Sequence, residues 1–102
     1  MIVMKNEFQI MISFRTPSGF KVCGQYFLGQ NRAFAESVFA SLNGREGMDD
    51  KEMLHLDLME TVGEIPVRIK TISCKLSELC ENCQYITREL FLDSIYPVND
   101  NG

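Results

Sequence analysis

The chain has 102 residues, a formal net charge of −4, 45% apolar residues and 24% charged residues. That length fits one domain, which can bury a core without metal or disulfide staples. The negative charge argues against a general nucleic-acid binder, which needs a basic surface to meet phosphates. No stretch approaches the ~18 apolar residues of a membrane span, and the first residues lack the pattern of a signal peptide. We therefore expect a cytoplasmic protein with reduced cysteines, no cofactor and no bound metal.

The first part of the chain predicts a β-hairpin. Alternating apolar side chains over residues 8–14 and 20–28 indicate two strands, each with one buried face. Thr16-Pro17-Ser18-Gly19 lies between them and is typical of a three-residue hairpin loop. With that loop, every apolar position falls on one face. A two-residue loop would instead set Phe14 opposite Lys21 and mix the faces.

A helix, a loop and a second hairpin–helix unit follow. Apolar residues at spacings of three and four predict a helix over residues 31–42, with Asn31 as its N-cap. Residues 44–52 are charged and aperiodic, which indicates an exposed loop. Two further strands are predicted within residues 54–74, and a second helix over about residues 76–92.

Both halves of the chain, residues 8–43 and 53–92, therefore show the order strand, strand, helix. We predict one α+β domain over residues 1–96, with a two-layer ββαββα fold. Its four-stranded, mainly antiparallel sheet would carry both helices on one face. The pattern allows a pseudo-twofold repeat, although any two ββα units would look alike. Residues 97–102 are expected to form a disordered tail.

Cys80 and Cys83 form a Cys-x-x-Cys pair in the second predicted helix. They fall within its apolar stripe, where free cysteine packs as a small hydrophobic side chain. A zinc site needs about four ligands, and Cys23 and Cys74 are assigned to the opposite sheet face. A redox pair needs a lowered thiol pKa, which the negative Glu81 opposes. Core packing is therefore the prediction, with a metal or a thiol-redox role as the alternatives.

His55 is the only histidine, so any histidine-dependent catalysis must use it. Asp57 lies two residues away on the same strand, at roughly 7 Å, which is too far for a good direct contact. The predicted pairing sets Asp57 opposite Arg68, as an ordinary cross-strand ion pair, and His55 opposite Lys70. No nucleophile or second acid accompanies His55, so we assign no catalytic residue.

The sheet face without helices is the candidate binding surface. In the predicted register it carries four basic side chains and one acidic side chain, together with apolar residues that a water-facing sheet does not need. Arg15 and Lys21 lie side by side there, where like charges repel unless an acidic group covers them. The candidate binding residues are Arg15, Lys21, Gln25, His55, Arg68 and Lys70.

These features favour a small interaction or binding module that forms a homodimer through the uncovered sheet face. Self-association through a sheet edge, an anionic ligand and an acidic protein partner are alternatives for what binds. A solvated face with long side chains lying over the methionines is the plain alternative. A small enzyme that uses His55, or a thiol-redox or metal protein that uses Cys80 and Cys83, would be a different kind of protein altogether. No nucleic-acid or membrane partner is expected.

Overall fold

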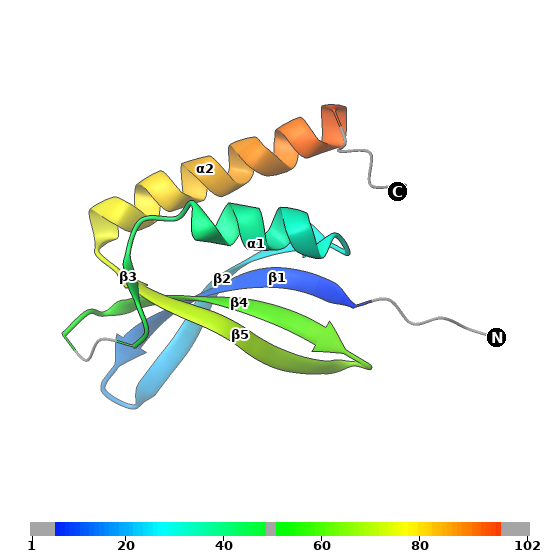
Figure 1. Cartoon of the computed structure of the whole chain (residues 1–102). Helices are drawn as coiled ribbons and strands as arrows, with labels where there is room; N and C mark the ends of the chain where they lie inside the picture. The colour runs from blue at the N-terminus through cyan, green and yellow to red at the C-terminus, as the bar shows by residue number, and fades with distance from the viewer. Residues whose placement is uncertain (1–5, 49–50, 97–102) are drawn as a thin grey trace.

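The computed structural model describes residues 6–48 and 51–96 and shows an α+β fold with one antiparallel sheet. Five strands lie in the order β2-β1-β4-β5-β3, and both helices lie on one face of the sheet (Figure 1). In chain order the elements are β1 (Glu7–Thr16), β2 (Gly19–Gly29), α1 (Arg32–Ala40), β3 (Arg45–Glu46), β4 (Leu54–Val62), β5 (Ile65–Cys74) and α2 (Leu76–Ile95).

The prediction of four strands is wrong by one, because β3 lies in the segment expected to be a loop. Arg45 pairs with Ser73 and Glu46 with Ile72, so β3 extends the sheet beyond β5. A strand of two residues has no periodicity that could reveal it in the sequence. The two halves also differ, since α1 has 9 residues and α2 has 20.

The turn between β1 and β2 has two residues, and the predicted three-residue loop is wrong. Thr16 pairs with Gly19, whose φ of 124° suits glycine, and Phe14 pairs with Lys21. A β-bulge at Cys23 then restores the predicted pairing further along, where Ile12 faces Gly24. Between the turn and the bulge every side chain of β2 is turned to the opposite face from the one predicted.

The β4–β5 register also differs from the prediction. His55 pairs with Ser73 and Leu56 with Ile72, and a bulge at Ile69 shifts the pairing further along the two strands. Ile72 therefore lies on the helix-bearing face, opposite to its predicted side. The sequence pattern does not mark this bulge. When the alternation of faces is continued past an unrecognised bulge, every residue beyond it is assigned to the wrong face.

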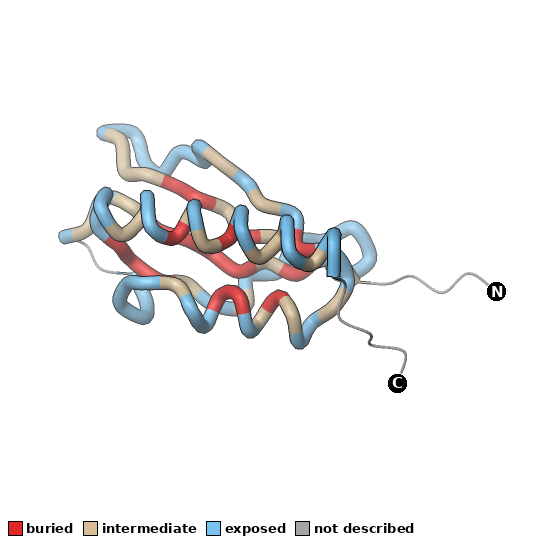
Figure 2. Tube along the Cα trace, turned by 90° about the horizontal axis from the view of Figure 1, so that it is seen from above, coloured by how far each residue is buried: buried red, intermediate tan, exposed pale blue. Residues whose placement is uncertain are grey.

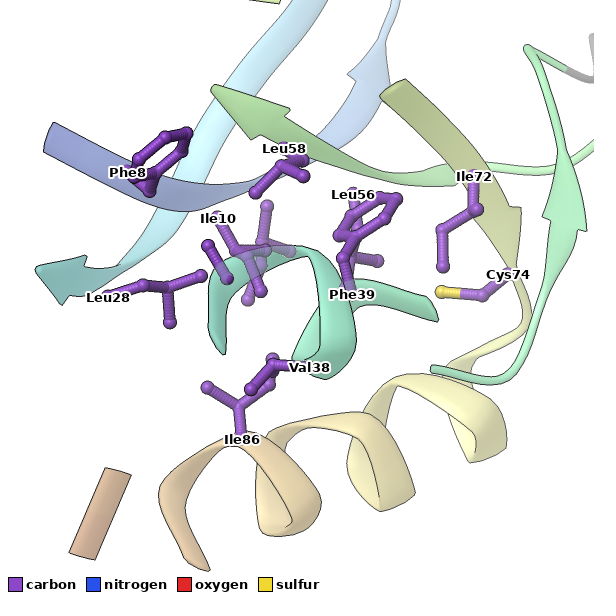
Figure 3. Packing of buried hydrophobic residues seen from close by; sticks show 12 residues of the cluster. Phe8, Ile10, Leu28, Val38, Phe39, Leu56, Leu58, Ile72, Cys74 and Ile86 are labelled. Atoms are coloured by element: carbon purple, nitrogen blue, oxygen red, sulfur yellow. The ribbon is translucent and has the colours of Figure 1, made fainter. Parts of the chain in front are cut away.

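The core lies between the sheet and the helices, and β1 and β4 supply much of it (Figure 3). Val38 of α1 and Ile86 of α2 point toward each other, while Phe39 packs beside Leu56 of β4 (Figure 3). The buried apolar residues are Phe8, Ile10, Ile12, Leu28, Ala35, Val38, Phe39, Leu56, Leu58, Ile72, Cys74 and Ile86. Val22 and Val67 lie on strands but are exposed.

Helix α1 begins as predicted. The side chain of Asn31 accepts a hydrogen bond from the backbone N–H of Phe34 at 3.1 Å, which caps the first turn. The buried residues Ala35, Val38 and Phe39 form the predicted apolar stripe against the sheet.

Helix α2 is rotated relative to the prediction, so that part of its apolar stripe faces outward. Leu76 and Cys80 are exposed, whereas the polar Asn82 is buried. The side-chain amide of Asn82 accepts from the backbone N–H of Asn43 at 2.7 Å and donates to the Asn43 carbonyl at 2.9 Å. These two bonds tie α2 to the chain just after α1 and fix which face of α2 turns inward. Much of the surface of α2 is exposed in Figure 2.

Over the described ranges 6–48 and 51–96, neither helix combines the length and apolar character needed to span a membrane.

Candidate functional site

We use the name open face for the side of the sheet opposite the helices. Directly paired residues in adjacent strands share a face, so the strand registers define it. No helix of residues 6–48 and 51–96 covers it (Figure 1). Its side chains are Glu7, Gln9, Met11, Ser13, Arg15, Phe20, Val22, Gln25, Phe27, Arg45, His55, Asp57, Met59, Thr61, Pro66, Arg68, Thr71 and Ser73.

Large apolar side chains are concentrated along one margin of the open face. On β2, Phe20 is 44% exposed, Val22 47% and Phe27 67%. Met11 on β1 and Met59 on β4 are half-buried. The sequence pattern assigned Phe20 and Val22 to the core, because the alternation carries no sign of the bulge at Cys23. Gly24 lies next to this bulge, and a glycine inside a strand often marks such an irregularity.

His55 lies beneath this apolar margin and is only 1% exposed. Its ring centroid is 4.6 Å from that of Phe20, with the two planes tilted by 42°. Neither ring nitrogen has a hydrogen-bond partner in the part of the chain that the structure describes. An imidazole enclosed in this way has no open path to a substrate while Phe20 covers it.

Asp57 takes part in a separate network on the open face. Its Oδ1 accepts a hydrogen bond from the hydroxyl of Thr71 at 2.6 Å and lies 3.6 Å from Nε of Arg68. The predicted Asp57–Arg68 pair is therefore present, although Thr71 rather than Arg68 stands directly opposite Asp57. Because Asp57 interacts with Thr71 and Arg68, it does not orient His55. This geometry therefore gives no support to the alternative of an enzyme that uses His55.

The six candidate binding residues do not form one cluster. Arg15, Gln25, His55 and Arg68 are on the open face. Lys21 is on the helix-bearing face because it pairs with Phe14, and Lys70 is there because it pairs with Leu58.

The predicted Arg15–Lys21 repulsion is consequently wrong. The guanidinium of Arg15 lies 5.3 Å from the ring centroid of Phe20, in a cation–π contact. Lys21 points to the other side of the sheet. The two cations therefore do not form a joint site for an anion.

All four cysteines are free thiols, and their surroundings differ. Burial, and after it the nearby Glu78 carboxylate, raises the pKa of Cys74 to about 11. Cys83 is half-buried, and Cys80 and Cys23 are exposed. The prediction that Cys80 packs in the core is thus wrong. The described part of the chain contains no group of three or more His, Cys, Asp or Glu residues arranged to hold a metal ion.

Cys83 nevertheless makes a contact that positions α2. The hydroxyl of Tyr26 on β2 meets the side chains of Cys83 and Thr87. The pKa of Tyr26 is raised, first by burial and then by the hydrogen bond with Cys83. The middle of α2 therefore sits over β2.

A cleft of about 600 Å³ opens at the end of α1, beside β3 and β5. Its lining includes Phe39, Leu42, Glu46, Lys70 and Ile72, so an apolar floor carries one cation and one carboxylate. Lys70 lines this cleft. The two buried ring nitrogens of His55, which lack hydrogen-bond partners, belong to the open face instead. Among the described residues, the open face is therefore the stronger candidate for a site.

Comparison with known proteins assigns no family. The chain matches no protein-family model, no curated protein and no solved structure. Its function therefore has to be argued from the geometry of its own surfaces.

Proposed function

We propose that this protein is an interaction module that forms a homodimer by packing its open face against the open face of a second copy. The observation that carries the proposal is the row of exposed Phe20, Val22 and Phe27 on a sheet face that no described helix covers. Monomeric proteins rarely leave contiguous apolar patches of this kind in water.

The size of the open face is sufficient for a specific contact. β1 has 10 residues, and four long strands lie side by side. At about 3.3 Å per residue and 4.8 Å between strands, the face covers roughly 600 Å². Two copies would bury about 1,200 Å², the lower end of the range for specific interfaces.

The chemistry of the face also fits an interface. Aromatic residues, methionine and arginine are enriched at protein interfaces, and here Phe27, Met59 and Arg68 lie in one row across the strands. Asp57 already has Thr71 and Arg68 as partners, so covering it would not bury an unpaired charge. Sheets packed face to face lie about 10 Å apart, which leaves room for these side chains to interdigitate.

The proposal is tested by the double change Val22→Glu, Phe27→Glu. Four new charges among the apolar side chains of a two-copy interface are strongly unfavourable, so we expect half the molar mass of the wild type at the same concentration. Sedimentation velocity or light scattering measures this mass.

The matched control is Val62→Glu, Ile65→Glu. These residues are exposed apolar side chains that pair with each other in the β4–β5 hairpin, on the helix-bearing face. The control should keep the wild-type mass. Equal masses for the wild type and the open-face variant would refute the proposal.

The cytoplasmic location remains part of the same proposal. Four free thiols in a chain of this size support it, because disulfides usually form in oxidising compartments.

A further inference from the structure

A second surface lies along the margin of the molecule formed by β2 and α2. β2 is the terminal strand of the sheet, so in the part of the chain that the structure describes its outer edge has no neighbouring strand. Such an edge presents unpaired backbone N–H and C=O groups that can add another strand. Lys21 is the only charged residue between Gly19 and Gly29, so side-chain charge gives this edge little protection.

Helix α2 places an apolar stripe above the same margin. Leu76, Cys80, Phe91 and Ile95 are exposed and recur at spacings that keep them on one side of the helix. Asn82 faces the end of α1, whereas Cys83 and Thr87 face Tyr26 of β2. The stripe therefore continues around α2 on the side away from α1, next to the free edge.

We propose that this margin binds a second copy of the same chain in an antiparallel arrangement. The two β2 strands would join into a continuous sheet of ten strands, five from each copy, and the two α2 helices would pack across the twofold axis. The proposal does not depend on the open face, which lies on the other side of the sheet.

The stripe is self-complementary under a twofold axis at the middle of α2. Leu76 and Ile95 are the two end residues of the helix, and Cys80 and Phe91 lie four positions inward from them. In an antiparallel pair of α2 helices, each Leu76 meets an Ile95 and each Cys80 meets a Phe91. A small side chain therefore stands opposite a large one in each inner pair, which suits close packing.

The strand register is compatible with an axis at the same place. A twofold axis perpendicular to the sheet keeps the helix-bearing faces of both copies on one side, so each β2 residue must pair with a residue of its own face. The regular segment between the two bulges of β2 runs from Gly24 to Phe27, and an axis through Gln25 meets this condition. Tyr26, the next residue, lies near Cys83 and Thr87 at the middle of α2, so an axis near Gln25 is compatible with the axis of the helix pair.

The area is near what a stable contact needs. A helix of 20 residues is about 30 Å long and 10 Å wide, or roughly 300 Å². An axis at Gln25 overlaps residues 21–29 of the two β2 strands, which adds about 30 Å by 5 Å. Two copies would bury about 900 Å², close to the ~1,000 Å² expected of a biological interface.

The first test compares neighbouring residues on α2. Phe91→Glu places a charge in the proposed stripe, and Leu92→Glu places the same charge on a side chain that is also exposed but points elsewhere around the helix. We expect Phe91→Glu to halve the molar mass in sedimentation velocity, and Leu92→Glu to keep the wild-type mass. Equal masses for the wild type and Phe91→Glu would overturn the proposal.

A second test identifies the edge that pairs. In a Cys23→Ser, Cys80→Ser background, Gln25→Cys should form a disulfide with its counterpart, because directly opposed residues have Cα atoms about 5 Å apart. Val67→Cys, an exposed position on β5, is the control. Cross-linking of Gln25→Cys no greater than that of the control would overturn the proposed pairing.

The two proposed surfaces fail separately in these measurements. A Val22→Glu, Phe27→Glu protein with wild-type mass rejects the open-face dimer, whatever Phe91→Glu does. A Phe91→Glu protein with wild-type mass rejects the β2–α2 contact, whatever the open-face variant does.

Discussion

Single side chains on the open face illustrate how a buried polar group can be kept without a partner. His55 is closed in by Phe20, and Arg15 stacks on the outer part of the same phenyl ring. A neutral imidazole always carries one N–H donor and one acceptor nitrogen. Leaving such groups unpaired in a buried position costs about 1–3 kcal/mol. The packing of Phe20 on the imidazole ring of His55 offsets part of this cost.

The change His55→Phe should therefore stabilise the protein. A phenyl ring fills the same flat space beside Phe20 and removes both unpaired nitrogens. We expect the free energy of unfolding to rise by about 1 kcal/mol, measured by urea titration. A loss of stability would show that the imidazole nitrogens make a contact that the phenyl ring cannot. Phe20→Leu, which uncovers the histidine but keeps it, should lower stability and serves as the comparison.

Between elements, the contact from α2 to the end of α1 decides the orientation of the long helix. Asn82 satisfies both backbone groups of Asn43 from a buried position. Tyr26 holds the other side of α2 through Cys83 and Thr87. With one side turned toward α1 and the underside on β2, the remaining apolar residues of α2 have no place in the core. These two contacts together leave the stripe facing outward.

Replacing Asn82 by alanine should be strongly destabilising. The change removes two hydrogen bonds and leaves the Asn43 backbone groups without those partners, so we expect a loss of about 2–4 kcal/mol in the free energy of unfolding. Asn43→Ala is the matched control. It keeps the backbone groups and removes only a side-chain bond to the exposed Glu81, so its cost should stay below about 0.5 kcal/mol. Similar losses for both variants would show that the Asn82 contact does not carry this stability.

At the scale of the whole molecule, the α+β class and the four long strands follow from hydrophobic period alone. The alternation in residues 8–14 and the helical spacing in residues 31–42 each specify an element and its buried face. The bulges at Cys23 and Ile69 could not be found in this way, because each inserts one residue into a strand without changing the residue types around it.

Those two bulges account for most of the errors in the candidate site. The first turned Phe20 and Val22 outward. Ile69 is the extra residue of the second, and the pairing beside it leaves Lys70 on the helix-bearing face with Leu58. The apolar content of the open face was expected from the sequence, whereas the residues that supply it became clear only from the pairing.

The two proposed surfaces together predict a tetramer. The open face and the β2–α2 margin share the strand β2 but use different side chains, so occupation of one leaves the other accessible. One twofold axis is normal to the sheet and the other lies between the packed faces, so where they intersect the wild-type protein should close as four copies. The double variant Val22→Glu, Phe27→Glu should form a dimer, and so should the single variant Phe91→Glu. Combining all three changes should give a folded monomer, because the substituted side chains are exposed and lie outside the buried core. Circular dichroism checks the fold, and light scattering measures the mass. A combined variant that remains dimeric would show that the protein associates through a third surface.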